Sequence, residues 1–122
     1  MMQYLKQRIA SFKYAFTGMT EVIQSQANPK IHILAALITI LGGWFFTIST
    51  EEWCLVIICI TSVLGAESLN SAIEYLTDLV SPEFHPLAKK TKDAAAAGVL
   101  WVAIGALLVG LVIFLPKVLA LL

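Results

Sequence analysis

The middle of the chain carries polar side chains at helical spacing. These are Glu67, Asn70, Ser71, Glu74 and Asp78. At about 100° per residue, all five share one helical face about 100° wide. Carboxylates stacked on one face repel one another, so cations, shared protons or a metal ion must compensate them. Carboxylates that hold Mg²⁺, beside lysines that neutralise phosphate, are the groups that phosphoryl transfer needs.

Spacing alone leaves several interpretations of this polar face open. It could be a solvated extension of a membrane helix, a catalytic site, or part of a path for cations or protons. A non-catalytic membrane subunit is a further alternative. A cation or proton transporter would place its acids in the middle of the membrane, whereas these gather at one end of an apolar segment. The chain has no P-loop and no kinase-type glycine-rich loop, so a nucleotide would be held mainly through its phosphates and metal.

The composition is that of a membrane protein. Hydrophobic residues make up 59% of the 122 residues and charged residues only 13%, against about 25% charged in soluble domains. So few charges cannot cover a globule of this size, and lipid must cover part of its surface. Eight basic and eight acidic residues cancel, so no overall charge attracts the chain to nucleic acid.

An amphipathic interfacial helix is predicted over 3–27. Apolar residues recur there at steps of three and four, while Lys6 and Arg8 lie off the stripe. Such a helix lies in the membrane interface with its apolar face down. Asn28-Pro29 is expected to break it. The apolar stripe consists of Leu5, Ile9, Phe12, Phe16, Met19 and Ile23.

The remaining sequence predicts an all-α integral membrane protein with a single domain, 1–122. A spanning helix needs about 20 apolar residues. His32, at the mouth of the first span, is expected to be a hydrogen-bonded residue rather than a catalytic one. The predicted order is a first span at 30–48, a second at 53–79 with a polar cytoplasmic extension, a cytoplasmic loop at 80–93 and a third span at 94–115.

The basic residues predict the orientation of these spans. Seven of the eight flank one membrane face, and only Lys117 lies at the other, with Glu51 and Glu52. Because positive charge favours the cytoplasmic side, the N-terminus and the 80–93 loop are expected in the cytoplasm and the C-terminus outside. The polar face of the second span would then meet soluble anions and Mg²⁺ at the cytoplasmic membrane surface.

The segment from Glu67 to Asp78 reads E-S-L-N-S-A-I-E-Y-L-T-D. It resembles the E-x-x-N-[ST]-A-I-E-x-x-x-D signature of the prokaryotic diacylglycerol kinase family, which includes undecaprenol kinases. The segment from His85 to Gly98 is similar to the second block of that family, and the likeness covers nearly the whole chain. It implies a homotrimer in the bacterial cytoplasmic (inner) membrane with active sites shared between subunits. It also implies direct transfer of the ATP γ-phosphate, with Mg²⁺, to the hydroxyl of a lipid alcohol.

The resemblance assigns catalytic roles to four residues. Glu67 would be the general base on the lipid hydroxyl, and Asn70 would position phosphate or the base. Lys92 would contact the transferring phosphate, with Asp93 beside it. Diacylglycerol, giving phosphatidic acid, is the first candidate acceptor, and undecaprenol, giving undecaprenyl phosphate, is the alternative. The segment 78–89 looks closer to the undecaprenol kinase members.

Nucleotide and metal roles follow from the same resemblance. Arg8 matches a basic residue of the family, Asp78 would support the nucleotide site, and His85 is a candidate phosphate contact. Glu74 would hold Mg²⁺ and, with Lys92, the ATP phosphates.

One position departs from the family pattern. Gln26 stands where the family often has a second metal-binding glutamate. An amide oxygen can coordinate Mg²⁺ but brings no charge, so either Glu74 and the ATP phosphates suffice, or metal affinity is weakened, or Glu21 contributes.

Overall fold

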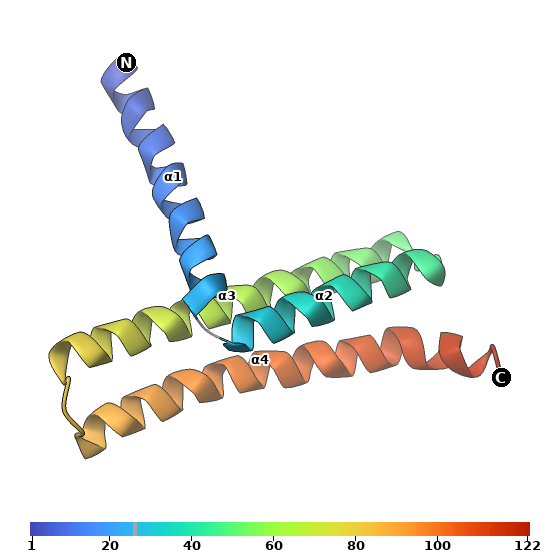
Figure 1. Ribbon diagram of the computed structural model, residues 1–122. Coiled ribbons are helices and arrows are strands. Elements are labelled where there is room, and N and C mark those ends of the chain that lie inside the picture. Colours follow the sequence, from blue (N-terminus) through green and yellow to red (C-terminus); the bar gives the residue numbers. More distant parts are fainter. Residues whose placement is uncertain (26) are drawn as a thin grey trace.

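The computed structural model describes residues 1–25 and 27–122, and these fold into helices without a strand. Three helices run side by side and the first projects away from them (Figure 1). The central helix is α3, which packs against each of the other three. The all-α prediction is therefore confirmed. The helices are α1 (Met2–Ser25), α2 (Ala27–Phe45), α3 (Thr50–Val80) and α4 (Pro86–Leu119).

Two of the described helices are long and apolar enough to cross a membrane. They are α3, with 31 residues, and α4, with 34, against the roughly 20 residues that a span requires. The helix α2 has 19 residues but falls short of the same measure. Its start is polar, because Asn28, Lys30 and His32 all lie within its first two turns.

The helix boundaries differ from the predicted ones most clearly in two places. Asn28 and Pro29 lie in the first turn of α2 rather than in a break, because a proline there removes only an amide that would have no partner in the helix. The loop expected at 80–93 is shorter, since α4 already begins at Pro86. His85 caps that helix, with its Nδ1 accepting a hydrogen bond from the Leu87 amide at 3.2 Å.

Polar contacts stabilise the end of the bundle where α3 begins. Ser49 caps α3 through its hydroxyl, which accepts a hydrogen bond from the Glu52 amide at 3.2 Å, and the Glu52 carboxylate accepts one from the Ser49 amide at 2.8 Å. This reciprocal pair satisfies two amides at the helix start. Lys117 of α4 donates to the other Glu52 oxygen at 2.7 Å, so the ends of α3 and α4 are joined.

An apolar core lies at the same end. Ile48, Val56 and Ile113 are buried there. Elsewhere most large apolar side chains are exposed on the outer surface of α2, α3 and α4. A surface of this kind needs lipid or further protein to cover it.

Close packing between α2 and α3 generates a stability prediction. A Cβ atom on Gly43 would lie 2.7 Å from Cη2 of Trp53, so Gly43→Ala forces the indole ring to move. Overpacking of this kind costs about 1–3 kcal/mol, and we expect the free energy of unfolding in detergent micelles to fall by that amount. Gly105→Ala is the matched control, because nothing lies within 4 Å of its Cβ position. Equal losses in both variants would contradict the packing explanation.

Candidate active site

The polar face predicted on the middle helix lies on the C-terminal half of α3, and its first three residues along the chain are buried. Glu67 is 1% exposed, Asn70 4% and Ser71 0%. An ionised or polar side chain is costly to bury unless it is paired. The partners of these side chains therefore decide what the site can do.

Glu67 pairs with His32 across two helices. Nε2 of His32 in α2 lies 3.1 Å from Oε1 of Glu67 in α3. This contact agrees with the expectation that His32 is hydrogen-bonded, although the sequence did not identify its partner. The second carboxylate oxygen, Oε2 of Glu67, is buried without a hydrogen-bond partner in the described part of the chain. One oxygen is held and the other remains available.

Asn70 links the cluster to the next carboxylate along α3. Its Nδ2 donates to Oε1 of Glu74 at 3.1 Å. Oδ1 of Asn70 and Oγ of Ser71 are buried without a hydrogen-bond partner within the described ranges. We call His32, Glu67, Asn70, Ser71 and Glu74 the Glu67 cluster.

A cavity of about 230 Å³ adjoins this cluster. Its lining combines the polar side chains of α2 and α3 with small and aliphatic residues of α4. A hydroxyl or phosphate group entering it would meet the unpartnered oxygens of Glu67 and Asn70 on one side and apolar side chains of α4 on the other. The lining consists of Asn28, His32, Glu67, Asn70, Ala96, Val99, Leu100 and Ala103.

Two ion pairs lie further along, near the connection between α3 and α4. Lys92 Nζ contacts Oδ1 of Asp78 at 2.5 Å, and Lys89 Nζ contacts Oδ2 of Asp93 at 2.5 Å. Both pairs are largely solvent-exposed, where an ion pair contributes only about 0–1 kcal/mol. Each lysine can therefore exchange its carboxylate for a phosphate at little cost.

The structure does not bring every predicted residue to this place within one chain. Arg8 donates to the Tyr4 hydroxyl at 2.8 Å and lies on the half of α1 that projects away from the other helices (Figure 1). His85 caps α4 at the connection. Gln26 lies outside the described residues.

Sequence reasoning missed the pairing of His32 with Glu67 and the place of Asn28 in the cavity wall. A signal for the first was present. An imidazole near the end of an apolar helix needs a polar partner, and the Glu67 carboxylate is the nearby acid that lies deepest in the apolar part of α3.

The acids of the cluster fit one mode of magnesium binding. The described residues contain no group of three or more His, Cys, Asp or Glu side chains placed to hold a metal ion. Magnesium in kinase sites is commonly held by one or two carboxylates together with substrate phosphates, and keeps several waters. Glu67 and Glu74, about two turns apart on α3 with Asn70 bonded to Glu74, match that arrangement rather than an all-protein cage.

Comparisons with known proteins agree with this chemistry. The family model described as prokaryotic diacylglycerol kinase matches residues 13–114. The chain is 38% identical to the undecaprenol kinase of Bacillus subtilis over 88% of its own length and 87% of that protein. It is 35% identical to the diacylglycerol kinase of Synechocystis over 93% of its length, but spans only 65% of that relative. The diacylglycerol kinase of Pseudomonas aeruginosa is 32% identical over 76% of each chain.

The buried pair makes a prediction about stability. His32→Leu leaves the Glu67 carboxylate buried without its imidazole partner. Breaking a fully buried pair costs about 3–5 kcal/mol, and because the His32 side chain is 24% exposed we expect about 2–3 kcal/mol, measured by unfolding in micelles.

The control for this prediction removes both polar groups. His32→Leu combined with Glu67→Leu should recover most of the lost stability, because no unpaired carboxylate then remains buried. If the double variant is as unstable as the single one, the loss does not come from an unpaired, buried Glu67 carboxylate.

Proposed function

Because the chain belongs to the prokaryotic diacylglycerol kinase family and is a membrane lipid kinase, we propose that it transfers the ATP γ-phosphate directly to a lipid hydroxyl at the Glu67 cluster. One observation carries this proposal. Oε2 of Glu67 is a buried carboxylate oxygen without a partner among the described residues, beside a cavity of about 230 Å³. A base in that setting has an acceptor site to offer and little water to compete for it.

Glu67 is the general base of the proposed reaction. His32 holds Oε1, so Oε2 accepts the proton of the lipid hydroxyl. The hydroxyl oxygen then forms a bond to the γ-phosphorus, the bond from the γ-phosphorus to the bridging oxygen of ADP breaks, and ADP leaves with that electron pair. General-base catalysis of this kind contributes about 10²–10⁴-fold.

Asn70 and Glu74 continue the site toward the nucleotide. Glu74 is the proposed magnesium ligand, held by its hydrogen bond from Asn70. When bound, Mg²⁺ supplies positive charge that stabilises the phosphate oxygens during transfer. Gln26 stays a candidate second ligand on the family pattern alone.

The phosphates are proposed to meet the residues at the connection between α3 and α4. Lys92 leaves Asp78 to contact the transferring phosphate, and Asp93 lies one residue further on the same helix. His85 uses only Nδ1 as a helix cap, so Nε2 can donate to phosphate. Asp78 then faces the nucleotide site.

Arg8 reaches a site only if that site belongs to another subunit. Within its own chain it lies on the projecting half of α1. We therefore propose a homotrimer in which each active site combines the Glu67 cluster of one subunit with α1 of a neighbour. The exposed apolar surface of the three packed helices supports such an assembly.

Three spans and an interfacial helix are proposed for the bacterial cytoplasmic membrane. The 19 residues of α2 are about 28 Å long, close to the roughly 30 Å hydrocarbon core. With α2, α3 and α4 crossing the bilayer, α1 leaves the bundle sideways (Figure 1) and exposes apolar residues such as Phe12 and Phe16. A cavity between α1 and α3, lined in part by Met19 and Ser68, supports a position of α1 at the depth of the Glu67 cluster.

Undecaprenol is the acceptor that the comparisons favour. The undecaprenol kinase relative is matched over 87% of its length, whereas the diacylglycerol kinase with 35% identity is matched over 65%. The sequence put diacylglycerol first, and the comparisons fit both acceptors. Diacylglycerol remains the second candidate because several relatives carry that name.

Glu67→Gln tests the assignment of the base. The amide keeps the shape of the side chain but cannot accept the proton, and we expect the rate to fall about 10²–10⁴-fold. The measurement is transfer of labelled phosphate from ATP to undecaprenol and to diacylglycerol in mixed micelles. Ser68→Ala is the control, since this exposed neighbour bonds only to its own helix. A variant with more than a tenth of normal activity would rule out Glu67 as the base.

Glu74→Gln tests the assignment of the metal ligand. Loss of one negative ligand should raise the Mg²⁺ concentration for half-maximal rate by roughly tenfold or more, by analogy with other losses around a metal site. Glu83→Gln is the control, because this exposed acid lies in the connection before α4. An unchanged magnesium dependence with a lower maximal rate would assign Glu74 another role.

A further inference from the structure

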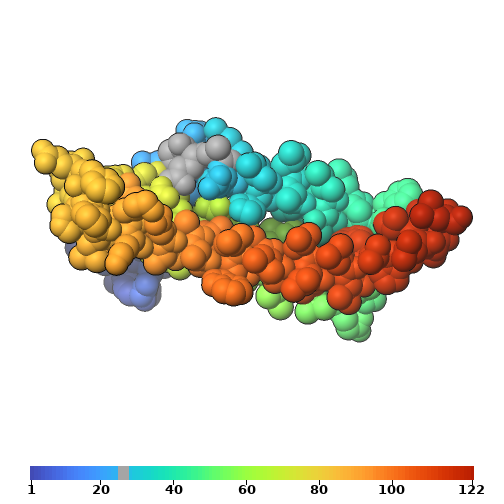
Figure 2. Space-filling model, turned by 90° about the horizontal axis from the view of Figure 1, so that it is seen from below, coloured from blue at the N-terminus to red at the C-terminus, as the bar shows by residue number. Residues whose placement is uncertain are grey.

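The first helix, α1, has an apolar stripe that the rest of the chain leaves uncovered. The helix contacts α2 and α3 and otherwise stands off from the bundle (Figure 1). In the view from below, it lies behind the bundle and only parts of it show past the edge (Figure 2). The side chains of its stripe are exposed from Leu5 to Met19. A helix in this position needs a partner outside its own chain.

The cavity between α1 and α3 identifies the side of α1 that faces the bundle. Its lining includes Ala15, Gly18 and Val22, which lie about 80–140° to one side of the apolar stripe on a helical wheel. Lys6 and Lys13 lie about 80–100° to the other side of the stripe. We call these two lysines the basic flank. Because it is on the opposite side of the helix, the basic flank points away from the bundle of its own chain.

Arg8 does not belong to the basic flank. It lies about 60° from the stripe on the side that faces the bundle. Its guanidinium donates to the Tyr4 hydroxyl at 2.8 Å and lies 4.9 Å from the centre of the Tyr4 ring. The basic flank therefore meets a different partner from Arg8.

No acid pairs with the basic flank in the part of the chain that the structure describes. The helix α1 has no acidic residue before Glu21, so nothing offsets its positive charge along most of its length. Among the exposed acids that the structure describes, Asp78 and Asp93 are already paired with lysines. A second copy of the chain thus offers this flank few acids, whereas an anionic membrane surface offers many.

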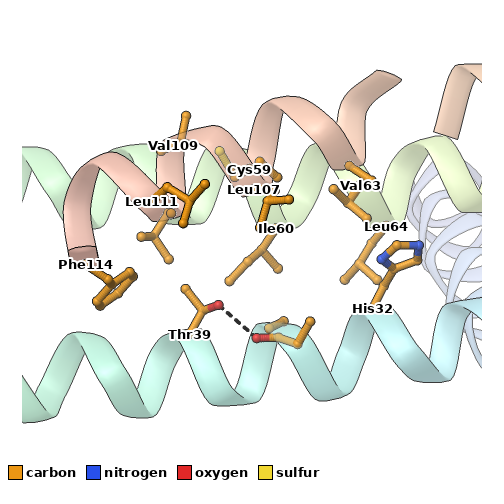
Figure 3. Close-up of a pocket in the computed structure, with 16 residues that line it drawn as sticks. His32, Thr39, Cys59, Ile60, Val63, Leu64, Leu107, Val109, Leu111 and Phe114 are labelled. Carbon is orange, nitrogen blue, oxygen red and sulfur yellow. Dashed lines mark hydrogen bonds between the residues drawn. The ribbon is translucent and has the colours of Figure 1, made fainter. Parts of the chain in front are cut away.

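The cavity among α2, α3 and α4 does not suit a charged headgroup. Its volume is about 470 Å³, and no lysine or arginine is among the described residues that line it. Its wall is apolar apart from His32 and Thr39, and the Thr39 hydroxyl already donates to the Ala35 carbonyl at 2.8 Å (Figure 3). The basic flank offers the positive charge that this cavity lacks.

We propose that the basic flank of α1 binds the phosphate groups of anionic phospholipids in the membrane leaflet in which α1 lies. The apolar stripe enters between the acyl chains, and the lysine side chains extend sideways to the headgroups. Each basic residue near an anionic surface strengthens association about fivefold.

Binding of anionic lipid has a consequence for the rate. The same helix carries Arg8 toward the active site of a neighbour in the proposed trimer, so lipid that fixes α1 also fixes Arg8. Only this effect on the rate rests on the proposed function.

Photoreactive phosphatidylglycerol tests the binding itself. It is added to the protein in an uncharged detergent and irradiated, and the concentration for half-maximal adducts on α1 is measured. We expect this concentration to rise about fivefold in Lys13→Gln and about 25-fold in the double variant Lys6→Gln/Lys13→Gln. The double variant Lys6→Arg/Lys13→Arg keeps both charges and should stay within twofold of the wild type.

Lys90→Gln is the matched control for Lys13→Gln. It removes one positive charge from an exposed lysine of α4 and should leave the half-maximal concentration within twofold. An unchanged value in the double Gln variant, or an equal rise in Lys90→Gln, overturns the proposal. A changed oligomeric state of the double Gln variant also overturns it, because the flank would then contact a second copy.

Vesicles of phosphatidylcholine with and without 30% phosphatidylglycerol test the effect on the rate at a fixed amount of lipid acceptor. We expect phosphatidylglycerol to raise the wild-type rate at least threefold and to leave the rate of the double Gln variant unchanged. Equal responses of the two proteins overturn the effect on the rate. If the wild-type protein phosphorylates no lipid alcohol in either kind of vesicle, the proposed function fails, whereas the adducts on α1 still decide whether the basic flank binds anionic lipid.

Discussion

The structure depends on one buried carboxylate. Glu67 is 1% exposed where α3 changes from an apolar to a polar sequence, and an ionised carboxylate is costly to bury without a partner. The contact with His32 supplies that partner and ties the start of α2 to the middle of α3. The contact with His32 offsets part of the cost of burying the carboxylate. Because the imidazole contacts only Oε1, the second oxygen, Oε2, remains available.

The two ends of the bundle differ, since one is stabilised by packing and polar contacts and the other contains cavities. At the end where α3 begins, a capping box, the Glu52–Lys117 pair and a small apolar core fasten α3 to α4 and α2. Toward the other end, cavities replace the core, and the exposed Lys92–Asp78 pair can open at little cost. The contacts at the first end keep α2, α3 and α4 in register, so the other end can contain cavities. A kinase needs such cavities for its substrates.

Local patterns predicted the helices and the polar face but not the contacts between helices. The spacing from Glu67 to Asp78 placed that face correctly on α3, because helical periodicity is a property of the chain alone. The pairing of His32 with Glu67 depends on how α2 packs against α3, which no local pattern encodes. The connection before α4 was predicted too long, because a polar, lysine-rich segment is typical of a loop. In the structure, His85 caps a helix that begins at Pro86. The family resemblance assigned Arg8 to the site, whereas α1 carries it away from the cluster of its own chain.

A position in the membrane explains why a lipid kinase can use so small a chain. A soluble kinase needs a pocket for each of its two substrates. A membrane lipid kinase meets its lipid substrate in the bilayer that surrounds the protein. The helices need only hold a buried carboxylate, Glu67, beside a cavity with room for a lipid hydroxyl. The membrane then supplies the acceptor at a fixed depth. Only the nucleotide must be captured from water, and exposed charged residues lie beyond the apolar part of α3, at the connection to α4.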